Sequence, residues 1–284
     1  MAGRQAYRIR KMGPNETHNK HRRAFPFLAQ EVIRISDVIL QVLDARFLEE
    51  TRNLELEKMV KDMGKILVNV LNKVDLVDLR ELRENQMLVG LEPYVLFSSS
   101  KRIGLGKLRE RIKIEVKKFI GKHNKAHVGV IGYPNTGKSS LINSLSGRAK
   151  AGTASEAGFT KGIQKIRFSK DILILDTPGV IPDKENSRKY DRHLKKHTMI
   201  GAQTYNKVRD PDLIVNEIMQ KDPELLEDFY GIESKGDSEV FLEKLGKRRN
   251  FLKKGGAVDI DRAARVVLKD WQEGKIVKDK ENYS

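Results

Sequence analysis

The sequence predicts an α/β fold, in which a doubly wound, mainly parallel sheet is followed by a C-terminal all-α domain. Three observations support this prediction. Between residues 27 and 182, short apolar runs alternate with segments of helical periodicity, which is typical of strands joined by crossover helices. A glycine-containing loop at residues 132–139 joins one apolar run to a helix. Beyond this region the alternation stops, and only helical patterns recur from residue 183 to residue 284.

The elements of the predicted sheet domain follow a basic arm, residues 1–26, which has no periodicity and is expected to be flexible. Apolar residues take up helical spacing from Phe27 onward. Because helical patterns separate the first strands, the sheet should be parallel and covered on both faces. Strands are predicted at residues 37–46, 65–71, 94–97, 127–131, 165–169 and 172–175. Helices are predicted near residues 53–63, 79–89 and 105–120 and from residue 140 onward.

The predicted helical domain begins with a basic, helix-compatible stretch at residues 184–196. Further helices are predicted near residues 212–220, 223–230, 238–245 and 261–272. In the last of these, Ala264, Val267, Leu268 and Trp271 fall on one face, so we expect Trp271 to lie in the core.

The composition limits which kinds of site and which cellular locations are possible for this chain. The chain of 284 residues contains no cysteine, which excludes disulfides, thiolate–metal sites and a cysteine nucleophile. It has no run of eighteen apolar residues and no signal-peptide pattern. We therefore expect a cytoplasmic protein that does not enter the membrane, and we expect it to be a monomer.

The positive charge is concentrated in two segments. The formal net charge is +16; residues 1–27 hold seven Lys and Arg against one Glu, and residues 101–125 hold ten against two. Such clustering favours a polyanionic partner. Few aromatic residues accompany these charges, so contact with a phosphate backbone is favoured over stacking on bases.

The loop Gly132-Tyr133-Pro134-Asn135-Thr136-Gly137-Lys138-Ser139 has the spacing of a P-loop. Its glycines allow successive backbone N–H groups to surround a phosphate, and the helix that follows directs its positive dipole end at the same point. The ammonium of Lys138 would contact the β and γ phosphates, and the hydroxyl of Ser139 would ligate Mg²⁺. Together with Asn135, Thr136, Gly137 and Ser140, these residues form the predicted phosphate site.

A second motif, Asn72-Lys73-Val74-Asp75, ends the predicted strand at 65–71. The Asp75 carboxylate can accept hydrogen bonds from both N1–H and the exocyclic amine of guanine, a pair of donors that adenine does not offer. Asn72 would brace the loop and the stem of Lys73 would cover the base. The segment Ser98 to Lys101, also at a strand end, could present a backbone N–H to the guanine O6. Its register is open by one residue, with Ser99 and Ser100 as candidates.

The third motif is Asp176-Thr177-Pro178-Gly179, at the end of the last apolar strand. There the carboxylate of Asp176 can hold the water shell of Mg²⁺, while the Gly179 N–H contacts the γ-phosphate. The same pattern at Asp228 to Gly231 is interpreted as a helix end. Thr160, in the Gly-, Ala-, Ser- and Thr-rich segment 148–162 that we expect to be mobile, is the candidate for a second Mg²⁺ ligand. Lys138, Thr160 and Gly179 are thus the candidate catalytic residues.

These motifs resemble those of GTPases, but the guanine-reading motif precedes the P-loop here. That order resembles the circularly permuted GTPases of the YlqF/RbgA type, which act in assembly of the large ribosomal subunit. Further similarity lies in the segment from Ser36 to Arg46 and in the C-terminal segment from Asp261 to Ile276. A permutation is physically reasonable because the termini of a doubly wound domain lie close together, so residues 121–125 need bridge only a short gap.

The resemblance implies a GTP- and GDP-binding hydrolase that docks on ribosomal RNA or a large-subunit precursor. It also implies that Asn135 helps to hold a potassium ion. Val180 stands where many GTPases have a water-orienting Gln, so unassisted hydrolysis should be slow and stimulated by potassium and ribosomal particles. Bacterial members carry an aromatic-Pro-Gly-His-Met motif near the N-terminus that Met12-Gly13-Pro14 lacks, so neither His18 nor His21 is assigned that histidine's role.

Two other interpretations compete with a GTPase switch. One is an RNA-binding assembly factor in which the nucleotide is structural. The other is a P-loop ATPase or kinase, against which Asn72 and Asp75 argue, because Asp75 would select guanine from a loop that Asn72 braces.

Overall fold

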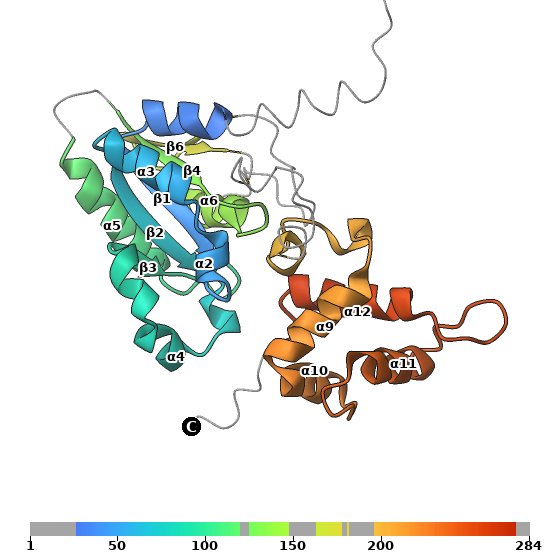
Figure 1. Ribbon diagram of the computed structural model, residues 1–284. Coiled ribbons are helices and arrows are strands. Elements are labelled where there is room, and N and C mark those ends of the chain that lie inside the picture. Colours follow the sequence, from blue (N-terminus) through green and yellow to red (C-terminus); the bar gives the residue numbers. More distant parts are fainter. Residues whose placement is uncertain (1–26, 120–124, 148–162, 178–180, 182–195, 277–284) are drawn as a thin grey trace, which may run out of the picture.

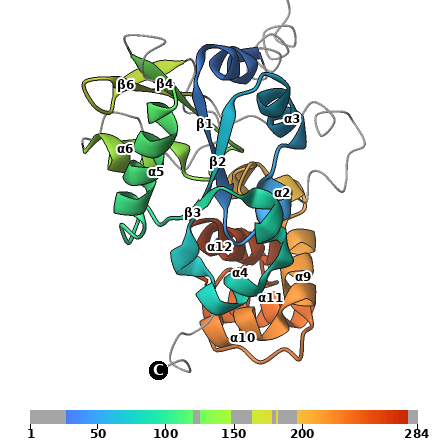
Figure 2. The ribbon, with the colours of Figure 1, turned by 90° about the vertical axis from the view of Figure 1, so that its left-hand side faces the viewer.

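The computed structural model describes residues 27–119, 125–147, 163–177, 181 and 196–276 (Figure 1). The predicted N-terminal arm and the segment 148–162 lie outside the described residues. Two units lie side by side in both views, one built around a sheet and one built of helices (Figures 1 and 2).

The sheet has six strands, which are β1 (Val38–Asp44), β2 (Ile66–Asn72), β3 (Tyr94–Leu96), β4 (Ala126–Ile131), β5 (Gln164–Arg167) and β6 (Ile172–Asp176). Their order across the sheet is β3-β2-β1-β4-β6-β5. Every neighbouring pair is parallel except β5 and β6, which are antiparallel. The predicted α/β fold with a mainly parallel sheet is therefore confirmed.

The helical segments of the sheet unit are α2 (Leu48–Thr51), α3 (Leu54–Asp62), η1 (Val74–Leu76), α4 (Leu79–Glu84), η2 (Gln86–Leu91), α5 (Leu105–Lys117) and α6 (Lys138–Ser146). A further helix, residues 27–35, precedes β1. Together they cover both faces of the sheet, as Figure 2 shows.

The two faces of the sheet have separate apolar layers. Apolar residues of α5 and α6 pack on one face, against strand residues such as Val38, Leu40 and Val42. Helix 27–35 and α3 pack on the other face, through residues that include Ile33 and Val60. Since both faces are covered, all seven residues of β1 are buried, including the polar residue in the middle of the strand.

The predicted helix at residues 79–89 is shorter than expected. It ends at Glu84 and a 3₁₀ segment follows. The physical reason lies at Asn85, which has an extended backbone and accepts a hydrogen bond from the N–H of Met87 through its side chain. A side chain that caps the next segment in this way competes with continuation of the helix.

The helical unit has its own apolar core, which includes Ile214, Phe241, Leu245 and Val267. Its elements are η3 (Tyr205–Lys207), α9 (Pro211–Lys221), α10 (Pro223–Tyr230), α11 (Ser238–Arg248) and α12 (Ile260–Gln272). The interpretation of Asp228 to Gly231 as a helix end is confirmed, because α10 ends at Tyr230 and Gly231 caps it with a φ of 59°.

Trp271 packs against the core of the helical unit, as predicted, but its side chain is only half-buried. It also packs against a smaller cluster that contains Phe47 and Tyr133 of the sheet unit. Its indole N–H donates to the carbonyl of Met199 at 3.0 Å. Trp271 therefore lies where the two units meet.

Candidate functional site

The loop between β4 and α6 has the backbone that its glycines permit. Gly132, Asn135 and Gly137 have φ values of 148°, 59° and 97°. A Cβ atom on Gly132 would lie 2.5 Å from the carbonyl oxygen of Val42, and one on Gly137 would collide with the side-chain amide of Asn72. These glycines are therefore required both by the backbone conformation and by the close approach of two other strands.

The first turn of α6 carries the predicted phosphate-binding side chains. The helix begins at Lys138, and the half-buried Ser139 and Ser140 follow in its first turn. The first N–H groups of a helix point beyond its N-terminus, here toward the preceding loop, and no side chain of the described residues caps them. The buried hydroxyl of Thr136 donates to the carbonyl of Tyr133 at 3.0 Å, which fixes the turn of the loop.

Lys138 is buried, with 6% of its surface exposed, and its ammonium donates to the carbonyl oxygen of Tyr133 at 2.6 Å. Burial lowers the pKa of Lys138 to about 8, and the nearby Asp176 opposes this shift. The ammonium is thus folded back onto its own loop. An anionic ligand at the helix start would give it a stronger partner than one carbonyl.

Asp176 ends β6 with 1% of its surface exposed, and within the described part of the chain neither carboxylate oxygen has a hydrogen-bond partner. Burial raises the pKa of Asp176 to about 6, although Lys138 opposes the shift. A buried carboxylate without partners is costly. Its position beside the P-loop fits a group that would face a hydrated Mg²⁺ ion, since such an ion would supply the missing donors.

Asn72 ties the guanine-motif loop to the P-loop. Its amide nitrogen donates to the carbonyl of Thr136 at 2.8 Å, and its amide oxygen accepts from the hydroxyl of Ser99 at 3.3 Å and the backbone N–H of Ser99 at 3.4 Å. One buried side chain thus joins the loops that follow three strands, β2, β3 and β4. Asn72, which was predicted to brace this loop, therefore lies where it can do so.

The other predicted guanine-contacting residues lie in the same loop cluster. The Ser100 hydroxyl donates to Asp75 Oδ2 at 2.8 Å, which orients that carboxylate. Lys73 has a φ of 64°, and its ammonium pairs with Asp44 Oδ2 at 2.8 Å. The structure therefore brings Asn72, Lys73, Asp75, Ser99 and Ser100 together at the carboxyl edge of the sheet. Thr160 and Gly179 lie outside the described residues, as do His18 and His21.

Sequence reasoning missed a charged cluster beside this loop. Asp44 is completely buried at the end of β1 and pairs with both Lys73 and Arg46. Burial raises the pKa of Asp44, but Lys73 and Arg46 outweigh that effect and hold the pKa well below its ordinary value. The signal was present in Asp44-Ala45-Arg46, charged residues that directly follow a buried parallel strand and so lie at the edge where sites form.

The helical unit contacts both loops of the site. The Arg46 guanidinium donates to the carbonyl of Trp271 at 3.0 Å, and the side-chain amide of Asn135 donates to the carbonyl of Gly201. Gly274 lies against Leu76, next to Asp75, and a Cβ atom on Gly274 would lie 2.6 Å from Leu76 Cδ1.

Known proteins are similar to this chain in sequence and in fold. Residues 127–241 match the family model described as 50S ribosome-binding GTPase. The GNP-bound crystal structure of YlqF from T. maritima superposes with a TM-score of 0.57 at 25% identity, over 87% of this chain and 92% of that one. The guanine-motif loop follows β2 and the P-loop follows β4, so the motif order is inverted while the two loops remain in contact. The sheet unit has a P-loop GTPase fold in circularly permuted order. The predicted family resemblance is therefore confirmed.

Curated sequences extend the comparison. An uncharacterized GTP-binding protein of Methanocaldococcus jannaschii is 40% identical over 253 residues, which is 88% of this chain and 65% of that protein. The nuclear GTP-binding protein NUG1 of Saccharomyces cerevisiae is 32% identical over 91% of this chain and 56% of its own length. The chain thus spans about half to two thirds of the length of these curated relatives.

Proposed function

We propose that this chain is a GTP-hydrolysing switch that docks on ribosomal RNA or a precursor of the large ribosomal subunit. The observation that carries the proposal is the bridge made by Asn72, which joins a guanine-type loop to a P-loop. The family description, 50S ribosome-binding GTPase, supports the ribosomal partner. The net charge of +16 supports a polyanionic one.

In this proposal the nucleotide lies along the carboxyl edge of the sheet. Asp75, oriented by Ser100, accepts from guanine, and Lys73 covers the base. Ser99 or Ser100 supplies the N–H for the guanine O6. The P-loop residues from Asn135 to Ser140 surround the phosphates, with Lys138 released from the Tyr133 carbonyl to bind them.

Mg²⁺ would be held by Ser139 and Thr160, and by Asp176 through water, and the buried oxygens of Asp176, which lack a hydrogen-bond partner among the described residues, fit that role. The ion would neutralise charge on the β and γ phosphates. A potassium ion would be bound by the amide oxygen of Asn135, because its amide nitrogen is directed at Gly201. Hydrolysis without assistance should be slow, since Val180 cannot orient water.

The switch would act through Gly179, which lies between the Mg²⁺-proximal Asp176 and the proposed helical RNA-binding domain of residues 183–284. Loss of the contact between the γ-phosphate and the Gly179 N–H would then reposition that domain. Gly179→Ala should leave GDP affinity intact and abolish GTP-dependent binding to large-subunit particles. Unchanged particle binding would refute this coupling.

The decisive experiment compares GTPase rates in potassium and in sodium, with large-subunit particles added or withheld. A switch requires stimulation by particles and by potassium. GTP-dependent particle binding without stimulated turnover would favour an RNA-binding assembly factor with a structural nucleotide. If ATP competes with GTP equally well, the P-loop ATPase or kinase alternative is favoured. Binding of xanthosine triphosphate to the Asp75→Asn variant tests directly whether Asp75 recognises guanine.

We further propose that the protein is a cytoplasmic monomer. No helix in the described ranges is long and apolar enough to cross a membrane. The relative in Saccharomyces cerevisiae is named a nuclear GTP-binding protein, which is a different location from the one proposed for this chain. Light scattering with and without GTP would test the monomeric state.

A further inference from the structure

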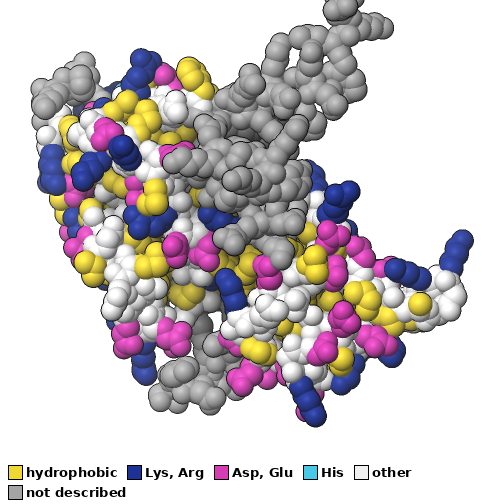
Figure 3. Space-filling view, in the orientation of Figure 1, with side chains coloured by type: hydrophobic (Ala, Val, Ile, Leu, Met, Phe, Trp, Pro, Cys, Tyr) yellow, Lys and Arg dark blue, Asp and Glu magenta, His cyan; other side chains and the backbone are white. Residues whose placement is uncertain are grey.

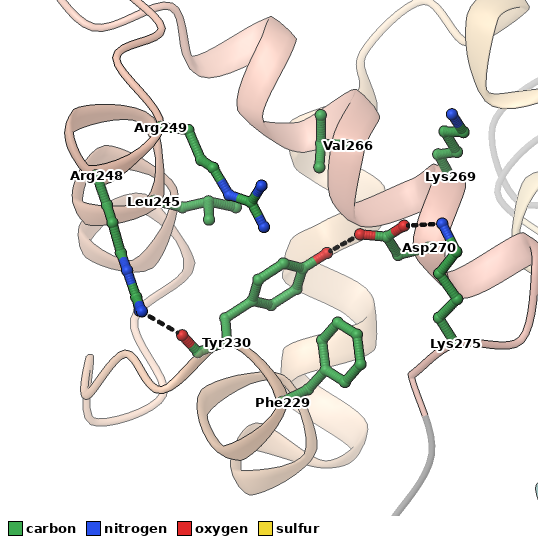
Figure 4. A pocket seen from close by; sticks show the side chains of 9 residues that line it. All are labelled: Phe229, Tyr230, Leu245, Arg248, Arg249, Val266, Lys269, Asp270 and Lys275. Carbon is green, nitrogen blue, oxygen red and sulfur yellow. Dashed lines mark hydrogen bonds and ion pairs between the residues drawn. The ribbon is translucent and has the colours of Figure 1, made fainter.

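A pocket of about 600 Å³ lies in the helical unit, away from the P-loop (Figure 4). Its walls come from the end of α10, the end of α11 and the second half of α12. Four of its nine lining residues are cationic and one is acidic. Its volume is in the range of pockets that hold small organic groups, which span about 300–1,000 Å³.

The single acidic residue of the pocket is already paired. Asp270 accepts the Tyr230 hydroxyl at Oδ2 and the Lys275 ammonium at Oδ1, both at 2.9 Å. Figure 4 shows this chain of contacts across the pocket. Lys275 also pairs with Glu273 at 2.7 Å, so this one cation is shared by two carboxylates. The three other cations of the lining still give the pocket an excess of positive charge.

Two of these cations are available to a ligand. Arg249, which is exposed, and Lys269, which is half-buried, have no carboxylate partner among the described residues. Arg248 differs, because it donates to the carbonyl of Tyr230 at 2.7 Å and so closes the end of α10. In Figure 4 the Arg249 guanidinium is directed toward the Tyr230 ring, whereas the Lys269 ammonium is directed away from the aromatic rings.

The aromatic wall of the pocket is made of rings in mutual contact and is partly exposed. Phe229 has 40% of its surface exposed. Its ring meets that of Tyr230 edge-to-face, with centroids 4.8 Å apart, and Tyr230 is held in turn against Phe241. An exposed aromatic ring that packs against a second ring, beside cations with no carboxylate partner in the described part of the chain, is suited to stack an unpaired base and hold its phosphate.

The charge continues beyond the pocket. Residues 244–254 hold six cations and no anion, and they lead from α11 into a loop that projects from the helical unit. On the face shown in Figure 3, cationic side chains project at that loop, while the adjoining surface of the helical unit carries both acidic and cationic side chains. A ligand that follows this surface has to carry negative charge along its length, which a nucleic-acid backbone does.

We propose that this pocket binds one unpaired nucleotide of an RNA, with the base stacked on Phe229 and the adjoining phosphates at Arg249 and Lys269. The inference rests on the proposed docking on RNA and adds a preference to it: the helical unit should select a bulged or looped nucleotide over a continuous duplex. It also revises the sequence-based expectation that stacking contributes little.

The test measures binding of the full chain, loaded with a non-hydrolysable GTP analogue, to two labelled RNA hairpins by fluorescence anisotropy. One hairpin is fully paired and the other has one unpaired adenine. The wild-type chain should prefer the bulged hairpin by about tenfold, the factor that corresponds to ~1.4 kcal/mol, at the low end of base–aromatic stacking. Phe229→Leu should remove that preference without weakening binding to the paired hairpin.

Three further variants make the test specific. Phe229→Trp should keep the preference, because it keeps a stacking surface. Phe27→Leu, at an exposed phenylalanine of the sheet unit, is the matched control and should change nothing. Arg249→Gln should lower the salt dependence of binding by about one phosphate contact. Circular dichroism melting would establish that each variant is folded.

The outcomes separate this inference from the proposed function. If neither hairpin binds, docking on RNA itself is refuted. If both hairpins bind equally and Phe229→Leu has no effect, the pocket inference fails while RNA docking stands. If a glutamate-rich peptide binds the wild-type chain and Phe229→Leu weakens that peptide instead of the bulged RNA, the pocket serves an acidic polypeptide and the inference is overturned.

Discussion

Replacing Arg46 with Met should lower the free energy of unfolding by about 3 kcal/mol. The guanidinium bonds Asp44 twice, at 2.8 Å and 3.0 Å, and donates to the Trp271 carbonyl at 3.0 Å. Asp44 is completely buried, and removal of one partner from a buried ion pair costs roughly 3–5 kcal/mol. The lower end applies because Lys73 still pairs with Asp44 at 2.8 Å.

Urea titration followed by Trp271 fluorescence would measure the loss. Trp271 is the one tryptophan of the chain, and the Arg46 guanidinium lies 5.9 Å from its ring centre, so its emission reports on the contact between the two units. With a urea slope of about 1–3 kcal/mol per molar, the midpoint should fall by at least about 1 M. The matched control is Arg34→Met, which breaks an exposed pair with Glu31 and should cost at most ~1 kcal/mol. The reasoning is refuted if Arg46→Met shifts the midpoint no more than that control.

Three further predictions concern the nucleotide site. Gly137→Ala should abolish GTP binding and lower the melting temperature more than Gly64→Ala does. Both glycines have a positive φ, but only Gly137 faces a side chain, that of Asn72. Equal melting temperatures of the two variants would show that the Asn72 contact is unimportant. GTP affinity, measured by calorimetry, should fall as the pH rises through about 8, where Lys138 loses the proton that phosphate binding requires, and Lys138→Arg should flatten this profile. Burial raises the pKa of Asp176, so without Mg²⁺ its contribution to stability should be complete below its ordinary pKa of 3.8 and be lost as the pH rises through about 6. Asp176→Asn should remove this pH dependence of the melting temperature, together with the Mg²⁺ dependence of GTP binding. An unchanged melting profile would contradict the prediction.

Local patterns predicted most of the sheet unit. β1 could be predicted because a strand buried on both faces has to be almost continuously apolar, and the P-loop because its chemistry fixes the spacing of Gly132, Gly137 and Lys138. The end of α4 was predicted less well, since it depends on whether the Asn85 side chain caps the next segment. The spacing of apolar residues does not indicate whether a side chain will cap the next segment in this way.

Contacts between distant segments could not be predicted in the same way. Arg46 and Trp271 are far apart in the chain and become partners only once the helical unit is placed against the sheet. The pocket at Phe229 likewise requires three helix ends to meet. The sequence does indicate which residues could make such contacts, because charged residues after a buried strand and an aromatic residue at a helix end both tend to contact another segment. It does not indicate which segment that is.

The position of the helical unit bears on how nucleotide state could reach RNA. The unit contacts the P-loop through Gly201 and Asn135, and it contacts the guanine-motif loop through Gly274 and Leu76. Gly274 permits that second contact because it has no Cβ and adopts a φ of 72°. Phosphate occupancy and guanine occupancy would therefore act on the same interface, in addition to the chain connection that follows Asp176. An interface that both loops share can respond to the whole nucleotide, whereas a single tether after Asp176 can respond only to the γ-phosphate.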